Sequence, residues 1–536
     1  MGTIKKPGIY IEEKNAFPNS VVEVPSAIPA FIGYTAKSPP NQHGRISSFS
    51  EYEKFFGGPP SRLFRLCGHR EESRQLEPAS AAKESTNKKE VNESIGEING
   101  YSLTRVGPEY WLYAAIRLFF RNGGGTCHIV SVGDYKDTEK IQAASLLEGL
   151  EALEKEMEPT LVLIPDAVSL DSPEVFYSLC RRMIAHCGKM RKRMAILDVY
   201  QGYSALQLPL GGKSVVDRFR EEVGSESLSY AAAYYPWLET AILAESELSF
   251  QNLTDGSLDL LVEMICEELS LTEHPKNESK NEAVRKERML SLVNQLPDYT
   301  ATTCKSWKDN PDNTGKTSPE DMHLSLLSLS SGYKALIRYL QKYLNQQPPS
   351  AAMAGIYTMV DSMRGAWMAP SNYSLSSVIA PSVPISTEQQ AYLNTPLDGK
   401  AVNAIRSFRG EGVLVWGART LDGNSEDWRY ISARRMTMVL EQSMLLATKA
   451  YTFEPNQART WISIKSMLEN FLIQLWKKGA LAGASPAEAF SVSVGLGETM
   501  TVADSENGIL RVRALVALSR PAEFIEISFE QSMQKA

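Results

Sequence analysis

The sequence has few of the residues that mark disulfide-bonded, zinc-binding and membrane-spanning proteins. Its 536 residues include six cysteines, at positions 67, 127, 180, 187, 266 and 304, and none of them forms a CxxC pair. This spacing argues against a disulfide framework or a four-ligand zinc site, and it predicts reduced, mostly buried thiols. No window reaches the roughly 18 consecutive apolar residues that a membrane-spanning helix needs. We therefore expect no metal site and no direct insertion into a membrane.

Motifs that carry catalysis or cofactor binding are also missing. There is no HExxH or GxSxG sequence, and the glycines at 123–125 follow a predicted helix rather than opening one, as a phosphate loop would. The best enzymatic signal is Asp166 and Asp198, which end two predicted parallel strands where open α/β sheets place ligands. Neither has a partner at recognisable spacing, so helix capping is favoured. We predict no catalytic residue and no cofactor.

An excess of basic charge is absent as well. Lys and Arg number 56 against 63 Asp and Glu, and the formal charge is −7. Nucleic-acid-binding domains usually carry a basic face, so nucleic acid is not an expected partner. The N-terminus has no apolar stretch of signal-peptide length after Lys5 and Lys6. We expect the protein to be made and kept in the cytoplasm until any assembly is released.

Alternating apolar and polar residues at both ends of the chain are typical of β-strands. Prolines at 7, 18 and 25 exclude helix from the first segment, residues 1–25. A lone terminal strand is unstable, so each end either folds onto its own domain or adds to the sheet of another chain. The alternation runs over Ile9, Tyr10, Ile11 and Glu12 and over Phe524, Ile525, Glu526, Ile527 and Phe529.

Strands alternate with helices through the first two thirds of the sequence, which predicts an α/β fold with a mainly parallel sheet. Two polar stretches, about 67–100 and 270–320, are expected to be surface insertions, the second with one helix, because they bury too little apolar area. The expected strands are 30–34, 127–132, 161–164, 194–200 and 231–235, and the expected helices are 110–121, 138–155, 172–186 and 321–346.

The last third has a different texture, with a hairpin, two helices and further strands. Apolar residues 413–416 and 428–431 flank a turn at 422–424, which predicts a β-hairpin. Apolar side chains at three- and four-residue spacing between Trp461 and Leu475 predict an amphipathic helix. The other expected elements are a helix at 434–450 and strands at 490–494 and 510–519.

Several blocks of this sequence resemble the contractile tail sheath proteins of phage tails, R-type pyocins and extracellular contractile injection systems. The resemblance covers about residues 347–536 together with the N-terminal arm, and the two polar insertions have no counterpart in it. The blocks are PGIYIEE at 7–13, PPSAAMAGIY at 348–357, RGAWMAPSN at 364–372, LN at 393–394, VNAIR at 402–406, GVLVWGARTL at 412–421 and FEPN at 453–456.

The resemblance implies a structural subunit rather than an enzyme. Such proteins stack as hexameric rings around an inner tube protein, join baseplate and cap proteins, and contract to drive the tube through a target envelope. It implies four parts: an extended arm 1–25, an outer variable α/β domain 26–346, an inner conserved α+β domain 347–520, and a strand-exchange arm 521–536. The alternatives are a minor sheath paralogue at the baseplate or cap, and an enzyme that uses Asp166 or Asp198.

The resemblance also suggests which residues make contacts between chains. The two arms would pair with the sheets of neighbouring subunits, through the alternating residues at positions 9–12 and 524–529. On the predicted helix 434–450, Arg434, Arg435 and Glu441 are candidates to face the tube, although a solvated helix face explains their charge equally well. Whether the particle is released or anchored to a membrane stays open.

Overall fold

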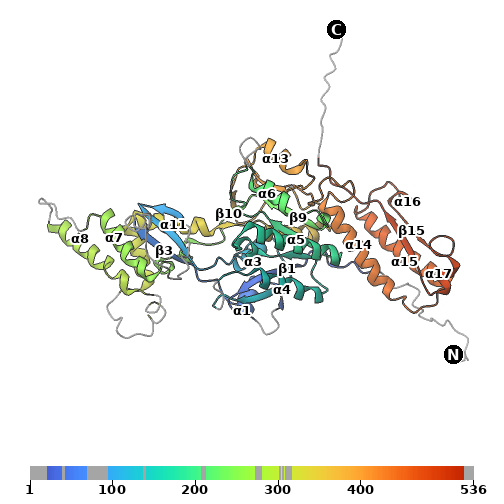
Figure 1. The fold of residues 1–536 in the computed structure, drawn as a ribbon, viewed down its shortest axis with the longest axis horizontal. Helices are drawn as coiled ribbons and strands as arrows, with labels where there is room; N and C mark the ends of the chain where they lie inside the picture. The colour runs from blue at the N-terminus through green and yellow to red at the C-terminus, as the bar shows by residue number, and fades with distance from the viewer. Residues whose placement is uncertain are drawn as a thin grey trace, which may run out of the picture.

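The computed structural model describes residues 21–38, 43–68, 94–136, 140–206, 213–271, 280–300, 304, 307 and 317–523. Both predicted arm strands lie outside these residues. The described residues form an elongated molecule with three parts in a row: an outer body, a central sheet with helices on both faces, and a C-terminal unit (Figure 1). This mixture confirms the predicted α/β class.

The central sheet has eight strands in the order β14-β13-β9-β8-β7-β1-β6-β2. All pairs from β13 to β6 are parallel, and the edge strands β14 and β2 pair antiparallel, which confirms a mainly parallel sheet. Every residue of β1, β8 and β9 is buried, as expected for strands covered on both faces. The strands are β1 Pro29–Thr35, β2 His43–Ile46, β6 Cys127–Asp134, β7 Leu161–Leu163, β8 Met194–Asp198, β9 Ala231–Tyr235, β13 Asn403–Phe408 and β14 Gly412–Trp416.

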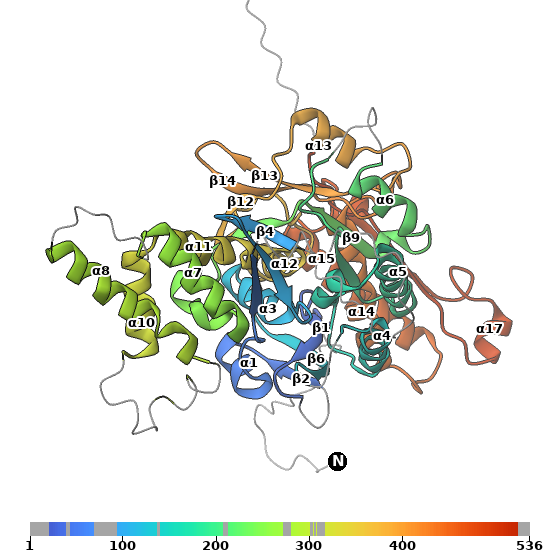
Figure 2. The ribbon, with the colours of Figure 1, turned by 60° about the vertical axis from the view of Figure 1, so that its left-hand side comes forward.

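Helices cover the two faces of this sheet and form a separate apolar core on each. Figure 2 shows α4 and α5 on one side of β1 and α3 on the other. Close packing of α12 on α3 requires Gly355, because a Cβ there would lie 2.7 Å from the carbonyl oxygen of Phe119. One face carries α4 Ala143–Ala152, α5 Pro173–Met190, α6 Val215–Glu222 and α13 Thr387–Asn394, and the other carries α1 Phe49–Phe56, α3 Leu112–Arg121 and α12 Ser350–Arg364.

The outer body consists of two segments of the chain, residues 63–106 and 244–344. Each segment leaves the central sheet and returns to it close to where it left. Leu63 pairs with Val106 where the first begins and ends, and the Thr240 amide donates to the Asn345 carbonyl at 2.8 Å beside the second. The outer body has its own apolar core. Its main elements are β3 Leu63–Gly68, β4 Ser94–Ile98, β5 Tyr101–Val106, α7 Leu258–Glu268, α8 Lys280–Val293, α10 Pro319–Leu329 and α11 Ser331–Leu344.

Two features of the outer body refine the sequence predictions. The helix expected at 321–346 is two helices, because the Ser330 hydroxyl accepts the Tyr333 amide at 2.9 Å and caps α11. The helix expected inside the second polar stretch is α8. The first polar stretch begins in β3 and ends in β4, and residues 69–93 between them are outside the described residues.

The C-terminal unit packs two long helices under a two-stranded antiparallel sheet. Its core is formed by the apolar face predicted for the second helix, with Ile464, Leu468, Leu472 and Leu475 all buried. The elements are α14 Ile431–Lys449, α15 Ala458–Lys477, β15 Phe490–Val494 and β16 Val512–Val516, with the short helices α16 Pro486–Ala489 and α17 Val502–Glu506 beside them.

The turn predicted at residues 422–424 is flanked by antiparallel pairing, but only through an isolated bridge between Arg419 and Tyr430. The predicted pairing of 413–416 with 428–431 is wrong. Strand β14 pairs instead with β13, through a turn where Gly410 and Gly412 adopt positive φ angles of 86° and 87°. This pairing places Val413 and Val415 in the core, while residues 428–431 lead into α14. The β13–β14 hairpin follows residue 346 in the chain and completes the sheet begun before it, so segments on both sides of that predicted boundary share one core.

Candidate assembly surfaces and anchors of the termini

The sheet of the C-terminal unit has unpaired edges. Strands β15 and β16 pair only with each other among the described residues, from Phe490 opposite Val516 to Val494 opposite Val512. Val492 and Val494 face the core, whereas Leu515 is 63% exposed. A strand edge presents free N–H and C=O groups, which makes it a template for a strand of another chain.

The segment before β1 is bound along α14. The Val24 amide donates to the Ser443 hydroxyl at 3.1 Å, and the Ser26 carbonyl accepts from Arg435 Nη2 at 2.9 Å. Glu23 lies 3.4 Å from the ammonium of Lys478 at the end of α15. These contacts, which we call the N-terminal anchor, hold residues 23–26 beside the C-terminal unit, although β1 belongs to the central sheet.

A buried ion pair lies at the centre of the N-terminal anchor. The Arg435 guanidinium binds the Asp361 carboxylate with two hydrogen bonds of 2.9 and 2.5 Å, and the two side chains are 1% and 5% exposed. The Ser26 hydroxyl donates to the same carboxylate, and the Tyr357 ring centre lies 4.7 Å from the guanidinium. Burial alone lowers the pKa of Arg435, but the Asp361 charge outweighs it, so the pKa is raised. The pair therefore joins α12, α14 and the N-terminal segment.

The C-terminal segment has an anchor of its own, which ends at the last described residue. Arg419 holds the Glu523 carboxylate through Nη2 at 2.6 Å and Nε at 3.0 Å, and Asn394 Nδ2 donates to it at 2.7 Å. Burial raises the pKa of Glu523, but these hydrogen bonds lower it by more, so the carboxylate stays charged. The Asn403 side chain in turn binds the Arg419 amide and carbonyl, both at 2.8 Å. The C-terminal segment therefore leaves from the central sheet.

The structure corrects two of the three candidate tube-facing residues. Arg435 is used in the buried pair, and Arg434, 6% exposed, lies between the rings of Tyr230 and Trp428, whose centres are 3.7 and 4.5 Å from its guanidinium carbon. The first turns of α14 pack against the central sheet, so neither side chain is exposed on the surface. Only Glu441 is exposed.

Asp166 and Asp198 follow or end strands of the central sheet, and each caps a helix that packs on that sheet. Asp166 accepts the amides of Tyr34, Trp111 and Leu112 at 2.7, 2.6 and 3.0 Å, which joins β1 to the start of α3. Asp198 accepts the amide and hydroxyl of Ser350 at 2.8 and 2.5 Å, at the start of α12. Burial raises the pKa of both carboxyls to about 6. The capping interpretation explains both residues.

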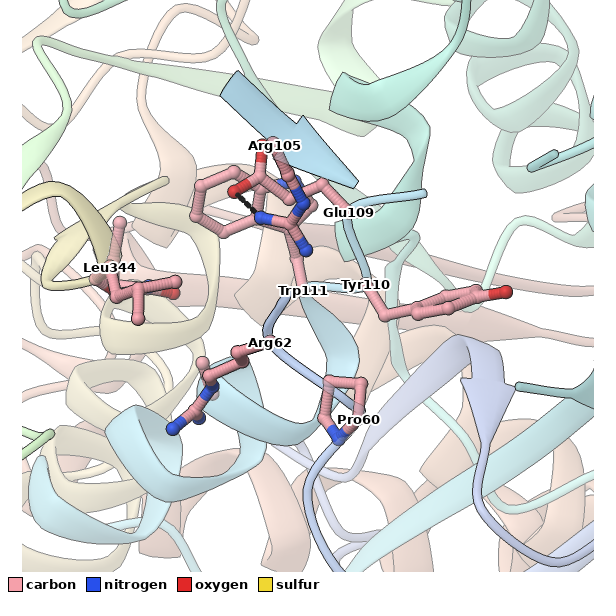
Figure 3. A pocket seen from close by; sticks show the side chains of 9 residues that line it. Pro60, Arg62, Arg105, Glu109, Tyr110, Trp111 and Leu344 are labelled. Atoms are coloured by element: carbon pink, nitrogen blue, oxygen red, sulfur yellow. Dashed lines mark hydrogen bonds and ion pairs between the residues drawn. The ribbon is translucent and has the colours of Figure 1, made fainter. Parts of the chain in front are cut away.

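Two cavities lie next to the anchors. One of about 300 Å³ is lined mainly by apolar side chains of the N-terminal segment, α14 and Met157, which is 73% exposed. Another of about 380 Å³ separates the RGAWMAPSN block from residues 519–522. A third, where the outer body joins the central sheet, holds only about 20 Å³ beside the Arg105–Glu109 ion pair (Figure 3). That space suits one water molecule rather than a ligand.

Sequence reasoning missed the residues that hold the two anchors. Asp361, Asn394, Asn403 and Arg419 all lie in or beside the blocks that carry the family resemblance, and their polar side chains were the available signal. Their partners are far away in the chain: Ser26 is 409 residues from Arg435, and Glu523 is 104 residues from Arg419. No local pattern relates positions at such distances.

Comparisons with known proteins relate this chain to tail sheath proteins. Residues 424–532 match the phage tail sheath C-terminal domain family. A putative prophage major tail sheath protein of Pseudomonas aeruginosa (strain UCBPP-PA14) is 27% identical over 141 residues, which are 25% of this chain and 34% of that protein. The alignment thus spans about a third of the relative's length. None of the described helices is long and apolar enough to cross a bilayer.

Solved structures match over almost the whole chain. The helical sheath of the anti-feeding prophage in its contracted state has a TM-score of 0.56 and 24% identity, and the match covers 99% of this chain and 100% of that one. The anti-feeding prophage baseplate, 6-fold symmetrised, contains a chain with a TM-score of 0.55 and 24% identity at the same coverage. Together these matches confirm the resemblance to contractile sheath proteins that the sequence blocks predicted.

Proposed function

We propose that this chain, whose residues 424–532 match a phage tail sheath C-terminal domain, is the structural subunit of a contractile sheath. The observation that carries the proposal is this domain match in a chain whose fold follows a contractile helical sheath from end to end. Subunits form hexameric rings that stack around an inner tube. Contraction follows when the subunits move into a more tightly packed lattice, since packed interfaces switch between discrete states.

Strand exchange would hold the subunits together. Among the described residues, the outer edges of β15 and β16 are both unpaired, and the chain has two arms with strand patterns, around residues 9–12 and 524–529. One arm from each of two neighbours fills both edges of a sheet. Because each chain donates and accepts at different places, the contact is heterologous, and it extends into rings or helices. The two anchors support this by fixing the chain on the inner side of each arm.

The remaining partners follow from the same role. The exposed face of α14, with Glu441 and the 61% exposed Leu445, is the proposed contact with the inner tube. Baseplate and cap proteins, and paralogous sheath subunits, would terminate the sleeve, and assembly would take place in the cytoplasm before any release. The similarity to a chain in a baseplate structure favours a second candidate, a minor sheath paralogue at the baseplate.

Electron microscopy of the purified protein, alone and with its candidate tube protein, tests the proposal. Hollow striated sleeves of uniform width are expected. A monodisperse monomer under both conditions contradicts a self-assembling major sheath and favours the paralogue, which would then assemble only on a preformed baseplate.

The arms are tested by changing Ile525 and Ile527 to Asp. Charges on the apolar side of the strand should prevent its addition to a neighbouring sheet, so we expect soluble subunits and no sleeves. The matched control Ser528→Asp places a charge on the polar side of the same segment and should leave assembly intact. Normal sleeves from the double variant would refute strand exchange by this arm.

A further inference from the structure

Two histidines and two glutamates gather at the edge of the central sheet. His43 lies on the edge strand β2 and His128 on its neighbour β6, one diagonal step apart in the antiparallel register. Glu156 and Glu158 follow the 3-10 turn Leu153–Lys155. His43 Nε2 is 2.8 Å from His128 Nδ1, and Glu156 Oε1 is 3.6 Å from His43 Nδ1.

A carboxylate binds Nε2 of His128, and this contact determines which nitrogen of the ring carries the proton. His128 Nε2 lies 2.7 Å from Glu158 Oε2, and Arg45 lies 3.2 Å from the same oxygen. Glu158 therefore accepts the Nε2 proton, and Nδ1 of this nearly buried ring turns an unshared electron pair toward His43. A histidine backed by a carboxylate in this way is the usual state of a metal ligand.

The two rings face each other through their ligand atoms. Their planes differ by 21° and their centres are 4.9 Å apart, so the two facing nitrogens point toward each other nearly within the ring planes. One proton is shared between them. A suitable nitrogen of each ring and a Glu156 carboxylate oxygen all lie within 4.8 Å of one another.

We propose that His43, His128 and Glu156 form a binding site for Zn²⁺, which takes the place of the proton shared by the two rings. Imidazole and carboxylate are ligands that zinc accepts, and a water molecule completes four-coordination. Two Zn–N bonds of tetrahedral geometry place the nitrogens about 3.4 Å apart. The rings must therefore separate slightly, which β2 permits because it pairs with β6 alone among the described strands.

Bound zinc would fasten the edge strand to its neighbour. Strand β2 has only four residues, and the metal would join it both to β6 and to the turn before β7. Binding to the folded state alone stabilises the protein by mass action, so zinc should raise the melting temperature.

Isothermal titration calorimetry of the full chain, stripped with EDTA and dialysed, tests the site. We expect one ZnCl₂ to bind per chain with micromolar or tighter affinity and MgCl₂ not to bind, because Mg²⁺ prefers oxygen ligands. His43→Gln and Glu156→Gln should each weaken zinc binding at least tenfold and remove the rise in melting temperature. His43 is about a quarter exposed on an edge strand, so its replacement should leave the fold intact.

A histidine remote from this cluster provides the matched control. His323 lies in the outer body and bonds the Tyr333 hydroxyl, so His323→Gln should bind zinc as the unaltered protein does. Zinc binding that persists unchanged in His43→Gln or in Glu156→Gln, or no saturable binding to the unaltered chain, would overturn the proposal.

Discussion

At the scale of single residues, the fold depends on buried charges whose partners come from distant parts of the chain. Arg435 and Asp361 neutralise each other between α14 and α12, and Arg419 and Glu523 do the same beside the central sheet. Burying an ion removes its hydration, so each charge is tolerated only while its partner is present. These residues therefore fix where segments meet more than they add stability.

The Arg435–Asp361 pair gives a direct prediction. Arg435→Met leaves the Asp361 carboxylate buried without its counter-charge, and we expect the free energy of unfolding to fall by about 3–5 kcal/mol. Urea unfolding followed by tryptophan fluorescence measures this change. The double variant with Asp361→Leu removes both charges and should recover most of the loss. An equal loss in both variants would show that packing, and not the unpaired charge, is responsible.

These residues also show what the sequence does not predict about the site. Arg434 and Arg435 look like a solvated pair at a helix end, because charge and spacing say nothing about what covers a helix. Only the fold shows that Tyr230, Trp428 and Asp361 surround them. The edge histidines are likewise 85 residues apart, and the register of β2 against β6 brings them together.

At the scale of elements, local patterns predict the helices and strands well but not all of their partners. The periodic apolar face of α15 and the apolar runs of β1, β6 and β9 are local signals, and each appears in the structure near its predicted bounds. The pairing of β14 was not predicted correctly, because both β13 and residues 428–431 are apolar segments near it in the chain and either could pair with it. Pairing with β13 buries Val413 and Val415 in the core, and this burial depends on contacts with distant segments that a local pattern does not reveal.

Helix α15 supports the sheet that is proposed to accept the arms. Leu472 is fully buried beneath that sheet, and Leu472→Ala should cost about 2–5 kcal/mol of unfolding free energy because it leaves a cavity. Hydrogen exchange should become faster in β15 and β16. The control on the same helix is Ile462→Ala, where the side chain is 65% exposed and the expected change is within about 0.5 kcal/mol. Similar losses in both variants would contradict this core assignment.

At the scale of the whole molecule, the outer body is attached without being part of the central cores. In each of its two segments, the residues at or next to the two ends are paired or hydrogen-bonded with each other. Its apolar core is separate from those of the central sheet. The sequence blocks that resemble sheath proteins all lie outside this body. We infer that the central sheet and the C-terminal unit fold without this body.

Removing the outer body tests this inference. Short Gly-Ser linkers in place of residues 63–106 and 244–344 should give a soluble protein, because Leu243 and Asn345 stay hydrogen-bonded at the second junction. Circular dichroism should keep a cooperative thermal transition. As a control, removal of only one of the two segments should give an insoluble protein, because the other segment would expose its half of the outer-body core. An insoluble double excision with soluble single ones would contradict the inference.

The C-terminal anchor has a mechanical consequence. Tension on the chain beyond Glu523 passes through its ion pair to Arg419 and through Asn403 to the carbonyl of Ala233 in β9. The load thus enters the middle of the eight-stranded sheet and bypasses the two-stranded sheet that precedes Glu523 in the chain. If a neighbouring subunit binds this end, as proposed, its displacement would pull on the central sheet rather than on β15 and β16.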